Sequence, residues 1–192
     1  AEDARAGEWV DGPGVAVFDA LRAALGDLPI VAEDLGVVDD GVIELLQAAD
    51  LPGMKVLQFA FGATSDNLYL PHNHPVRSVV YPGTHDNNTT LGWWQTAADH
   101  VMHHVRVYYG VPGDDIVWDL IKSAISSPAE LAVIAAQDLL NLDGDARMNT
   151  PAIPDGNWGW RLEQVPLPED VTGRLRFLVQ LYGRGAQHHY PG

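Results

Sequence analysis

Two short apolar runs in this sequence each lead directly into acidic residues. Residues 29–32 run into Glu33 and Asp34, and residues 78–81 are followed by a turn that contains His85 and Asp86. Each run has the length and composition of a short buried strand. In α/β folds the functional groups lie just beyond the carboxyl ends of such strands. Two strand ends can therefore hold two carboxylates over one pocket, and paired carboxylates are the basic apparatus of glycoside chemistry.

Strand and helix patterns alternate along the chain, which predicts parallel βα units. A helix is expected over residues 15–25. The next is expected up to about Ala49, with Asp39 or Asp40 as its cap. Further helical patterns cover residues 91–109, 114–126 and 168–182, and strands are expected at residues 28–32, 54–61, 78–81 and 131–135. Four such units correspond to half of a (β/α)8 barrel.

Several motifs occur in an order that identifies a family. They are Glu33-Asp34-Leu35-Gly36, the run 51–61, Gly83-Thr84-His85-Asp86-Asn87, Gly92-Trp93-Trp94, residues 146–151 and Gly156-Asn157-Trp158. This series resembles the 4-α-glucanotransferases called amylomaltases or disproportionating enzymes, which are (β/α)8 barrels active on α-glucans. The resemblance covers nearly the whole chain and implies an α/β fold.

The resemblance also implies that this chain is only part of an enzyme. Family members are much longer, and their catalytic nucleophile is an aspartate in an Arg-x-Asp-His-like segment that this sequence lacks. The chain begins with Ala1 in a polar stretch that looks like the loop after a missing strand. We therefore expect residues 1–192 to form a single partial domain, the C-terminal half of the TIM-type barrel.

The resemblance assigns roles to four residues. Glu33 matches the general acid/base, and Asp86 matches the carboxylate that stabilises the oxocarbenium-like transition state. His85 and Asn149 match residues that contact the sugar. From the sequence alone, a helix cap or a surface acid is the more common role for a glutamate such as Glu33, and the resemblance reverses this preference. The alternative for His85-Asp86 is a polar turn. Neighbouring strand residues point to opposite sides, so Asp34 is expected to fix the loop through backbone hydrogen bonds.

Composition limits the other functions. The formal net charge of −15 disfavours nucleic acid and anionic membranes as partners, and no apolar run approaches the length of a membrane span. The absence of cysteine excludes disulfides and thiolate zinc sites and fits a reducing, cytoplasmic compartment. No nucleotide-binding motif is present, so no cofactor is expected.

Aromatic and histidine residues allow weaker hypotheses. Four tryptophans could stack on sugars, although tryptophan at such positions more often packs in a core; they are Trp93, Trp94, Trp158 and Trp160. Histidines gather at residues 72–74, 100–104 and 188–189, but their spacing does not define a metal site, and none is expected.

The leading interpretation is the catalytic C-terminal part of a 4-α-glucanotransferase that transfers an α-1,4-glucan segment to another sugar with retention. An amylase-type α-glucan hydrolase is one alternative. A non-catalytic glucan-binding or structural fragment is another, because the nucleophile is absent from this chain. We expect the isolated chain to be inactive. Open strand edges at residues 28–32 and 131–135 should make it associate with the missing half or with itself.

Overall fold

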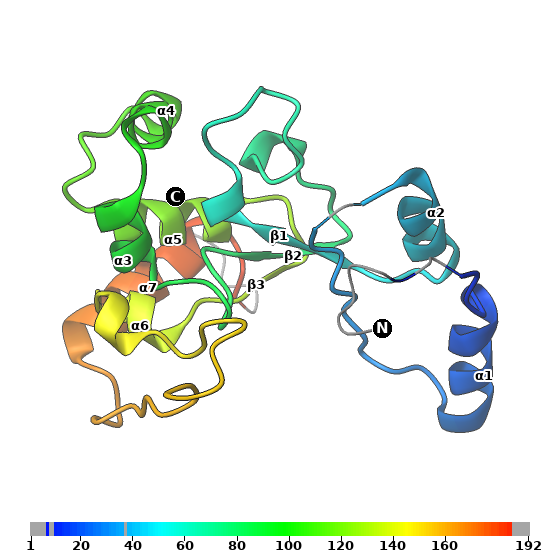
Figure 1. Cartoon of the computed structure of the whole chain (residues 1–192). Coiled ribbons are helices and arrows are strands. Elements are labelled where there is room, and N and C mark those ends of the chain that lie inside the picture. The colour runs from blue at the N-terminus through cyan, green and yellow to red at the C-terminus, as the bar shows by residue number, and fades with distance from the viewer. Residues whose placement is uncertain (1–6, 8–9, 37, 186–192) are drawn as a thin grey trace. The chain divides into compact units, whose positions relative to one another are not determined.

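The computed structural model describes residues 7, 10–36 and 38–185 of the chain (Figure 1). The chain divides into two compact units, Ala1–Met54 and Lys55–Gly192. Whether both belong to one partial barrel domain, as the sequence suggested, stays a prediction.

The first unit contains the two expected helices, α1 at Val15–Leu25 and α2 at Asp40–Ala48. The side chain of Asp39 accepts a hydrogen bond from the Val42 backbone N–H at 3.0 Å, which confirms the expected cap. The Arg22 guanidinium donates to the carbonyl of Ala49, which ties the first helix to the end of the second. Neither helix contains a fully buried residue.

The strand expected at residues 28–32 is wrong. This segment is extended but belongs to no sheet. The Ala32 N–H donates to the Pro52 carbonyl at 3.0 Å, whereas the Ile30 N–H turns back to the Leu28 carbonyl at 2.9 Å. Because a ladder needs repeated pairing with a neighbouring strand, apolar composition alone does not make this segment a strand.

The sheet has three strands in the order β1-β2-β3, with β2 in the middle (Figure 1). The strands are β1 at Gly53–Val56, β2 at Ser78–Tyr81 and β3 at Leu131–Ala132. β2 and β3 are parallel, and Val79 pairs with Leu131. The strand expected at 78–81 is therefore confirmed. A parallel pair brings the carboxyl ends of both strands to the same edge of the sheet.

Two other strands are shorter than expected. After β1 the chain turns into a 3₁₀ helix, η2 at Leu57–Phe59, in which the Ala60 N–H donates to the Leu57 carbonyl at 3.0 Å. Pairing with β2 continues past β3 through Val133, whose N–H donates to the Val80 carbonyl at 2.9 Å. The chain then enters the short helix α6, Ala136–Leu139, which the sequence did not predict. The apolar composition of these two runs predicted that they are buried, but it did not predict the residue at which each strand ends.

The helix expected at 91–109 is two helices, α3 at Thr90–Thr96 and α4 at Asp99–Tyr109. They are separated at Ala97 and Ala98, whose ψ angles of 143° and 150° are extended. The remaining helices are α5 at Ile116–Ser126 and α7 at Glu169–Leu181, close to the expected bounds. Short 3₁₀ turns lie at η3, Pro71–Asn73, and η4, Gly144–Ala146.

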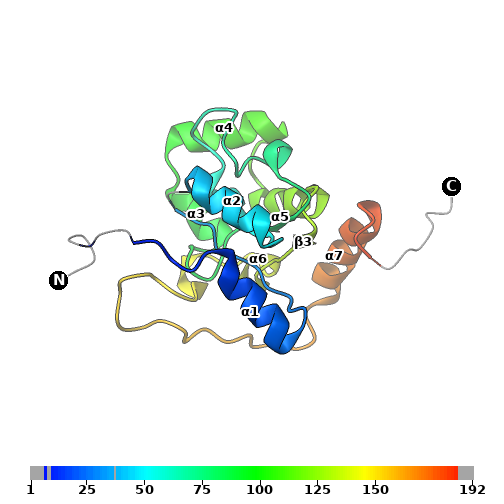
Figure 2. The same cartoon turned by 90° about the vertical axis from the view of Figure 1, so that its right-hand side faces the viewer.

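The core of the second unit is built around α5, which α3, α6 and α7 all contact (Figure 2). Leu120, Ile121 and Ala124 of α5 are fully buried. From α7, Leu178 is buried against the same core. Beyond α7, the Arg184 guanidinium donates to the carbonyls of Ile125 and Ser127 at 2.5 Å, which satisfies free carbonyls at the end of α5. This core supports the sheet edge where the polar residues gather.

Candidate functional site

The turn that follows β2 presents His85 and Asp86. Asn87 closes this turn, since its side-chain oxygen accepts from the Thr84 N–H at 2.9 Å and from the Thr84 hydroxyl at 2.8 Å. The Asn87 N–H in turn donates to the Thr84 carbonyl at 3.1 Å. A side-chain amide that bonds its own turn in this way is typical of Asn and stabilises a compact loop. The loop therefore holds His85 and Asp86 at a fixed place beyond the strand end.

Asp86 has a partly satisfied carboxylate. Its Oδ1 accepts a hydrogen bond from the Asn149 side chain at 2.6 Å and lies 3.3 Å from His85 Nε2. The Arg147 guanidinium donates to the Asp86 carbonyl at 2.6 Å, which fixes the backbone as well. The Asp86 side chain nevertheless remains 44% exposed. It is oriented by its neighbours and still has oxygen lone pairs available to a ligand.

His85 lies between the carboxylate and an aromatic ring. Its own ring is 5.1 Å from that of Trp158, at an interplanar angle of 39°. The Asn149 N–H donates to the His85 carbonyl at 3.1 Å, so Asn149 holds this residue through its backbone and Asp86 through its side chain. The cluster thus combines an acid, an imidazole, an amide and an exposed indole.

The loop between η4 and α7 supplies the second wall of this cluster. The Thr150 N–H donates to the Asn157 side chain at 2.8 Å, and the Asn157 amide donates to the Ile153 carbonyl at 2.7 Å. The Trp158 N–H donates to the Met148 carbonyl at 2.8 Å. These bonds bring Trp158 back beside the β2 loop, where it is 54% exposed.

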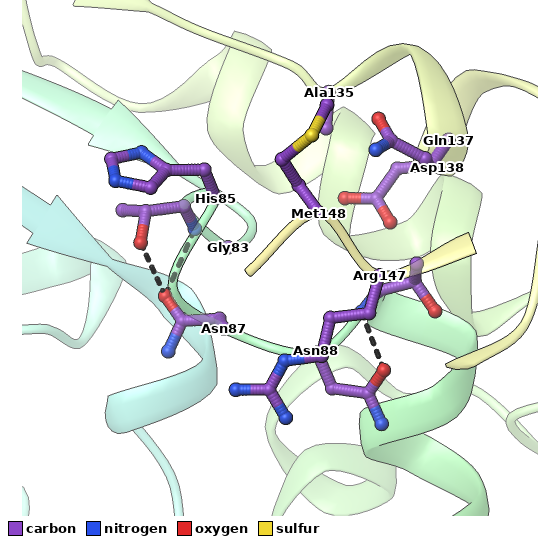
Figure 3. A pocket seen from close by; sticks show the side chains of 11 residues that line it. Gly83, His85, Asn87, Asn88, Ala135, Gln137, Asp138, Arg147 and Met148 are labelled. Carbon is purple, nitrogen blue, oxygen red and sulfur yellow. Dashed lines mark hydrogen bonds between the residues drawn. The ribbon is translucent and has the colours of Figure 1, made fainter. Parts of the chain in front are cut away.

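A pocket of about 110 Å³ lies next to the β2 loop (Figure 3). Three segments line it: the loop after β2, the start of α6 after β3, and Arg147 with Met148. In this view His85 and Asn87 lie on one side of Met148, and Gln137 and Asp138 lie on the other. The parallel strands β2 and β3 therefore both end at this pocket, as expected for an α/β site.

Asp138 is the buried acid of the pocket wall, with only 2% of its surface exposed. Burial raises the pKa of Asp138, and the hydrogen bonds from the Thr90 N–H and hydroxyl act in the opposite direction. These two bonds are 2.7 and 2.9 Å long. Both carboxylate oxygens are therefore occupied by Thr90, at the beginning of α3.

In the first unit Glu33 and Asp34 have different surroundings. The Asp34 carboxylate accepts from the Met54 N–H at 2.5 Å, which confirms that it fixes the local backbone. A Cβ added at Gly53 would lie 2.3 Å from an Asp34 carboxylate oxygen, so this close approach requires glycine. Glu33, by contrast, is exposed. Its role as general acid/base stays a prediction.

Comparison with known proteins identifies the family of this chain. The sequence model for the family described as 4-alpha-glucanotransferase matches residues 1–167. The chain belongs to this family. It is 48% identical to 4-alpha-glucanotransferase DPE1 of Arabidopsis thaliana over 96% of the chain, and 48% identical to the 4-alpha-glucanotransferase of Synechocystis over 95% of the chain. These matches cover 33% and 37% of the two relatives, so the chain spans about a third of their length.

The fold comparison gives the same family. Amylomaltase from Streptococcus agalactiae, solved in complex with acarbose, superimposes with a TM-score of 0.87 at 33% identity. The match covers 94% of this chain and 37% of that protein. The small sheet with its helices is therefore part of an α/β barrel of the 4-alpha-glucanotransferase family, as the sequence predicted.

Within the second unit, the structure brings together three of the four site residues chosen from the sequence: Asp86, His85 and Asn149. Glu33 belongs to the first unit. Arg147, which holds the Asp86 backbone, was missed, although it stands two residues before Asn149 in a motif of the 4-alpha-glucanotransferase family. The sequence does not show that the loop carrying Arg147 folds back against the loop after β2, so the hydrogen bond from Arg147 to Asp86 could not be predicted.

The tryptophans named from the sequence differ in burial, and Trp160 is intermediate. Trp93 and Trp94 pack against the core, as burial statistics favoured. Trp158 is exposed beside His85, so the expectation of a core position is wrong for this residue. Its φ of 62° belongs to a turn at the protein surface, which the Gly156-Asn157 pair before it could have indicated.

Within residues 7, 10–36 and 38–185, no three His, Cys, Asp or Glu side chains come together as metal ligands. His72 instead bonds Tyr108 and the Ser65 carbonyl, at 2.9 and 3.0 Å. His188 and His189 lie outside the described residues. None of the helices in the same part is both long and apolar enough to span a bilayer.

Proposed function

We propose that this chain provides the acid/base and the transition-state-stabilising carboxylate of a 4-α-glucanotransferase. The enzyme would cleave an α-1,4 bond of a glucan and transfer the glucan to the 4-hydroxyl of another sugar with retention. The observation that carries the proposal is the Asp86 carboxylate, which Asn149 orients beyond the end of β2 while 44% of the side chain stays exposed. Family membership supports the choice of reaction.

Each residue has a defined task in this mechanism. Glu33 donates a proton to the departing glycosidic oxygen and later removes one from the acceptor hydroxyl. Asp86 stabilises the positive charge that develops at C1 and accepts hydrogen bonds from sugar hydroxyls. His85 and Asn149 add contacts to the same sugar. The covalent intermediate requires an aspartate nucleophile, which we assign to a part of the enzyme other than this sequence.

We propose maltooligosaccharides or starch-like α-glucans as the substrates. The Streptococcus agalactiae amylomaltase, whose structure contains acarbose, supports this choice by similarity. The exposed Trp158 ring beside His85 offers an apolar face of the kind that sugar rings can cover. We also propose a cytoplasmic location, which the absence of cysteine favours, and association with the rest of the enzyme or with a second copy.

Two other functions give different products. An amylase-type hydrolase converts maltotriose only to shorter sugars, whereas a transferase gives glucose together with maltotetraose and longer chains. A non-catalytic glucan-binding fragment gives neither, and the absence of an Arg-x-Asp-His segment from this sequence favours that alternative for the chain alone. Chromatography of a maltotriose digest distinguishes all three.

The test compares an intact enzyme that carries this sequence with its Glu33→Gln and Asp86→Asn variants. Gln keeps the shape of Glu but cannot cycle a proton, so kcat should fall by roughly 10² to 10⁴. A donor with an activated leaving group should restore the first step of Glu33→Gln, because that step needs less protonation, but should not restore Asp86→Asn. Near-wild-type disproportionation by either variant would show that its assignment is wrong.

A further inference from the structure

The loop that carries His85 and Asp86 is flanked on both sides by buried polar side chains. β2, which leads into this loop, is the middle strand of the sheet (Figure 1). The chain leaving β1 contributes Gln58, and the chain leaving β3 contributes Asp138. Both side chains are buried, at 8% and 2% exposure. Neither has a place in the proposed chemical steps.

Gln58 contacts both ends of the loop. Its backbone N–H donates to the Pro82 carbonyl at 3.2 Å, just before the loop begins. Its side-chain amide donates to the Asn88 carbonyl at 2.9 Å, near the end of the loop. A Cβ added at Gly83 would lie 2.4 Å from the Gln58 amide nitrogen, so the glycine backbone lies directly against this side chain.

Asp138 fixes the segment that follows the loop. Its two oxygens accept from the N–H and the hydroxyl of Thr90, which is fully buried at the start of α3. Hydrogen bonds to a buried acceptor are costly to lose, because the acceptor then has no water to replace the donor. The exit of the loop is therefore joined to the chain beyond β3, as Gln58 joins it to the chain beyond β1.

We propose that Gln58 and Asp138 are positioning residues, which hold the His85–Asp86 loop from both neighbouring strands so that the Asp86 carboxylate stays in place for catalysis. This inference rests on the proposed function of Asp86. Displacement of a reacting or stabilising group by about 1 Å can cost roughly 10²-fold in rate. A small movement of this loop would therefore lower kcat while most sugar contacts, and hence KM, persist.

The test uses three substitutions in the intact enzyme. Gln58→Met keeps the length of the side chain but removes the donor to Asn88. Thr90→Val keeps the shape of threonine but removes the hydroxyl bond to Asp138, and Thr90→Ser retains that bond as the conservative rescue. We expect kcat to fall by about tenfold or more in Gln58→Met and Thr90→Val, with KM changed by less than about threefold. Thr90→Ser should recover most of the activity.

Tyr109→Phe is the matched structural control. It removes one part-buried hydrogen bond, from the Tyr109 hydroxyl to Ser123 at 2.8 Å, between α4 and α5. Tyr109→Phe should lower the melting temperature by about as much as Gln58→Met and Thr90→Val do, and it should leave kcat unchanged. The melting temperature of every variant is measured, so that a loss of folded protein is not mistaken for a loss of rate.

The outcomes separate this inference from the proposed function. If Asp86→Asn retains activity, the function assigned to Asp86 is wrong, and the positioning role of Gln58 and Asp138, which depends on it, is wrong too. If Asp86→Asn is inactive while Gln58→Met and Thr90→Val behave like Tyr109→Phe, only the positioning role is overturned. An effect on KM alone, or no rescue by Thr90→Ser, also overturns it. Should Gln58→Met not fold, the Thr90 pair decides by the same criteria.

Discussion

Replacing Asn149 by alanine should slow catalysis, because the substitution removes a single hydrogen bond to Asp86. The Asn149 side chain donates to Asp86 Oδ1 at 2.6 Å, whereas its backbone N–H donates separately to the His85 carbonyl at 3.1 Å. Alanine removes the first bond and keeps the second. The variant therefore isolates the orientation of the Asp86 carboxylate from the path of the loop.

The size of the effect follows from the charge and the exposure of the acceptor. A hydrogen bond to a charged group contributes about 1.5–3 kcal/mol. Because the Asp86 side chain is 44% exposed, water replaces part of the lost bond, and the lower end of that range applies. A loss of about 1.5 kcal/mol in transition-state stabilisation corresponds to about a tenfold decrease in kcat/KM.

The assay is the release of glucose from maltotriose by an intact enzyme carrying this sequence. Asn73→Ala is the control, because Asn73 also donates from its side-chain amide to backbone carbonyls, those of Ser65 and Asn67, away from the site. It should leave kcat/KM unchanged. A double-mutant cycle adds a second check: in the Asp86→Asn background, Asn149→Ala should cost clearly less than in the wild type.

Two results would contradict this reasoning. If Asn149→Ala retains wild-type kcat/KM, the amide does not orient a catalytic carboxylate. If its cost is the same with and without the Asp86 charge, the loss comes from another Asn149 contact, and the hydrogen bond at 2.6 Å is not its cause.

Three further predictions concern stability, activity and association. Burial lowers the pKa of His74 below 6.5, and the nearby charges of Lys55 and His72 lower it further. Just below pH 6.5 the imidazole is therefore protonated in the unfolded chain and neutral in the folded chain. The free energy of unfolding should therefore fall as the pH drops below about 6.5, and His74→Gln should flatten this decrease in denaturant titrations; parallel curves for the two proteins would refute the assignment. The isolated chain should not disproportionate maltotriose, because retention needs a nucleophile; rapid formation of longer maltooligosaccharides would contradict this. The isolated chain should also associate or aggregate, whereas a monodisperse monomer in sedimentation would show that the outer strands are covered.

The sequence predicted the elements that local patterns determine. The helix at Val15–Leu25, the Asp39 cap and the strand Ser78–Tyr81 follow from apolar periodicity and capping chemistry alone. Errors occur where pairing or turning depends on distant segments. The run at 28–32 lacks a continuous partner, so its composition did not make it a strand. The break between α3 and α4 lies at two alanines, which carry no signal for a helix end.

For the site, sequence motifs identified acids but not the groups that hold them. The partnership of Asp86 with Asn149 joins residues 63 positions apart, and that of Thr90 with Asp138 joins residues 48 apart. Spacing along the chain cannot reveal such contacts, because they form only when the loop after β2 meets the segments that follow β3 in the folded chain. Family resemblance supplied Asn149 as a sugar contact, and the structure adds that it orients the carboxylate.

The pair Glu33 and Asp34 shows how local geometry can assign different tasks to adjacent acids. Alternation predicts opposite directions for neighbouring side chains in extended chain, even where no sheet forms. Asp34 turns toward the start of β1, where it accepts from the Met54 N–H and lies against the bare backbone of Gly53. Glu33, by contrast, is exposed. Gly53→Ala should therefore displace Asp34 and with it the backbone that carries Glu33. Under the role proposed for Glu33, this shift should lower kcat for the disproportionation of maltotriose.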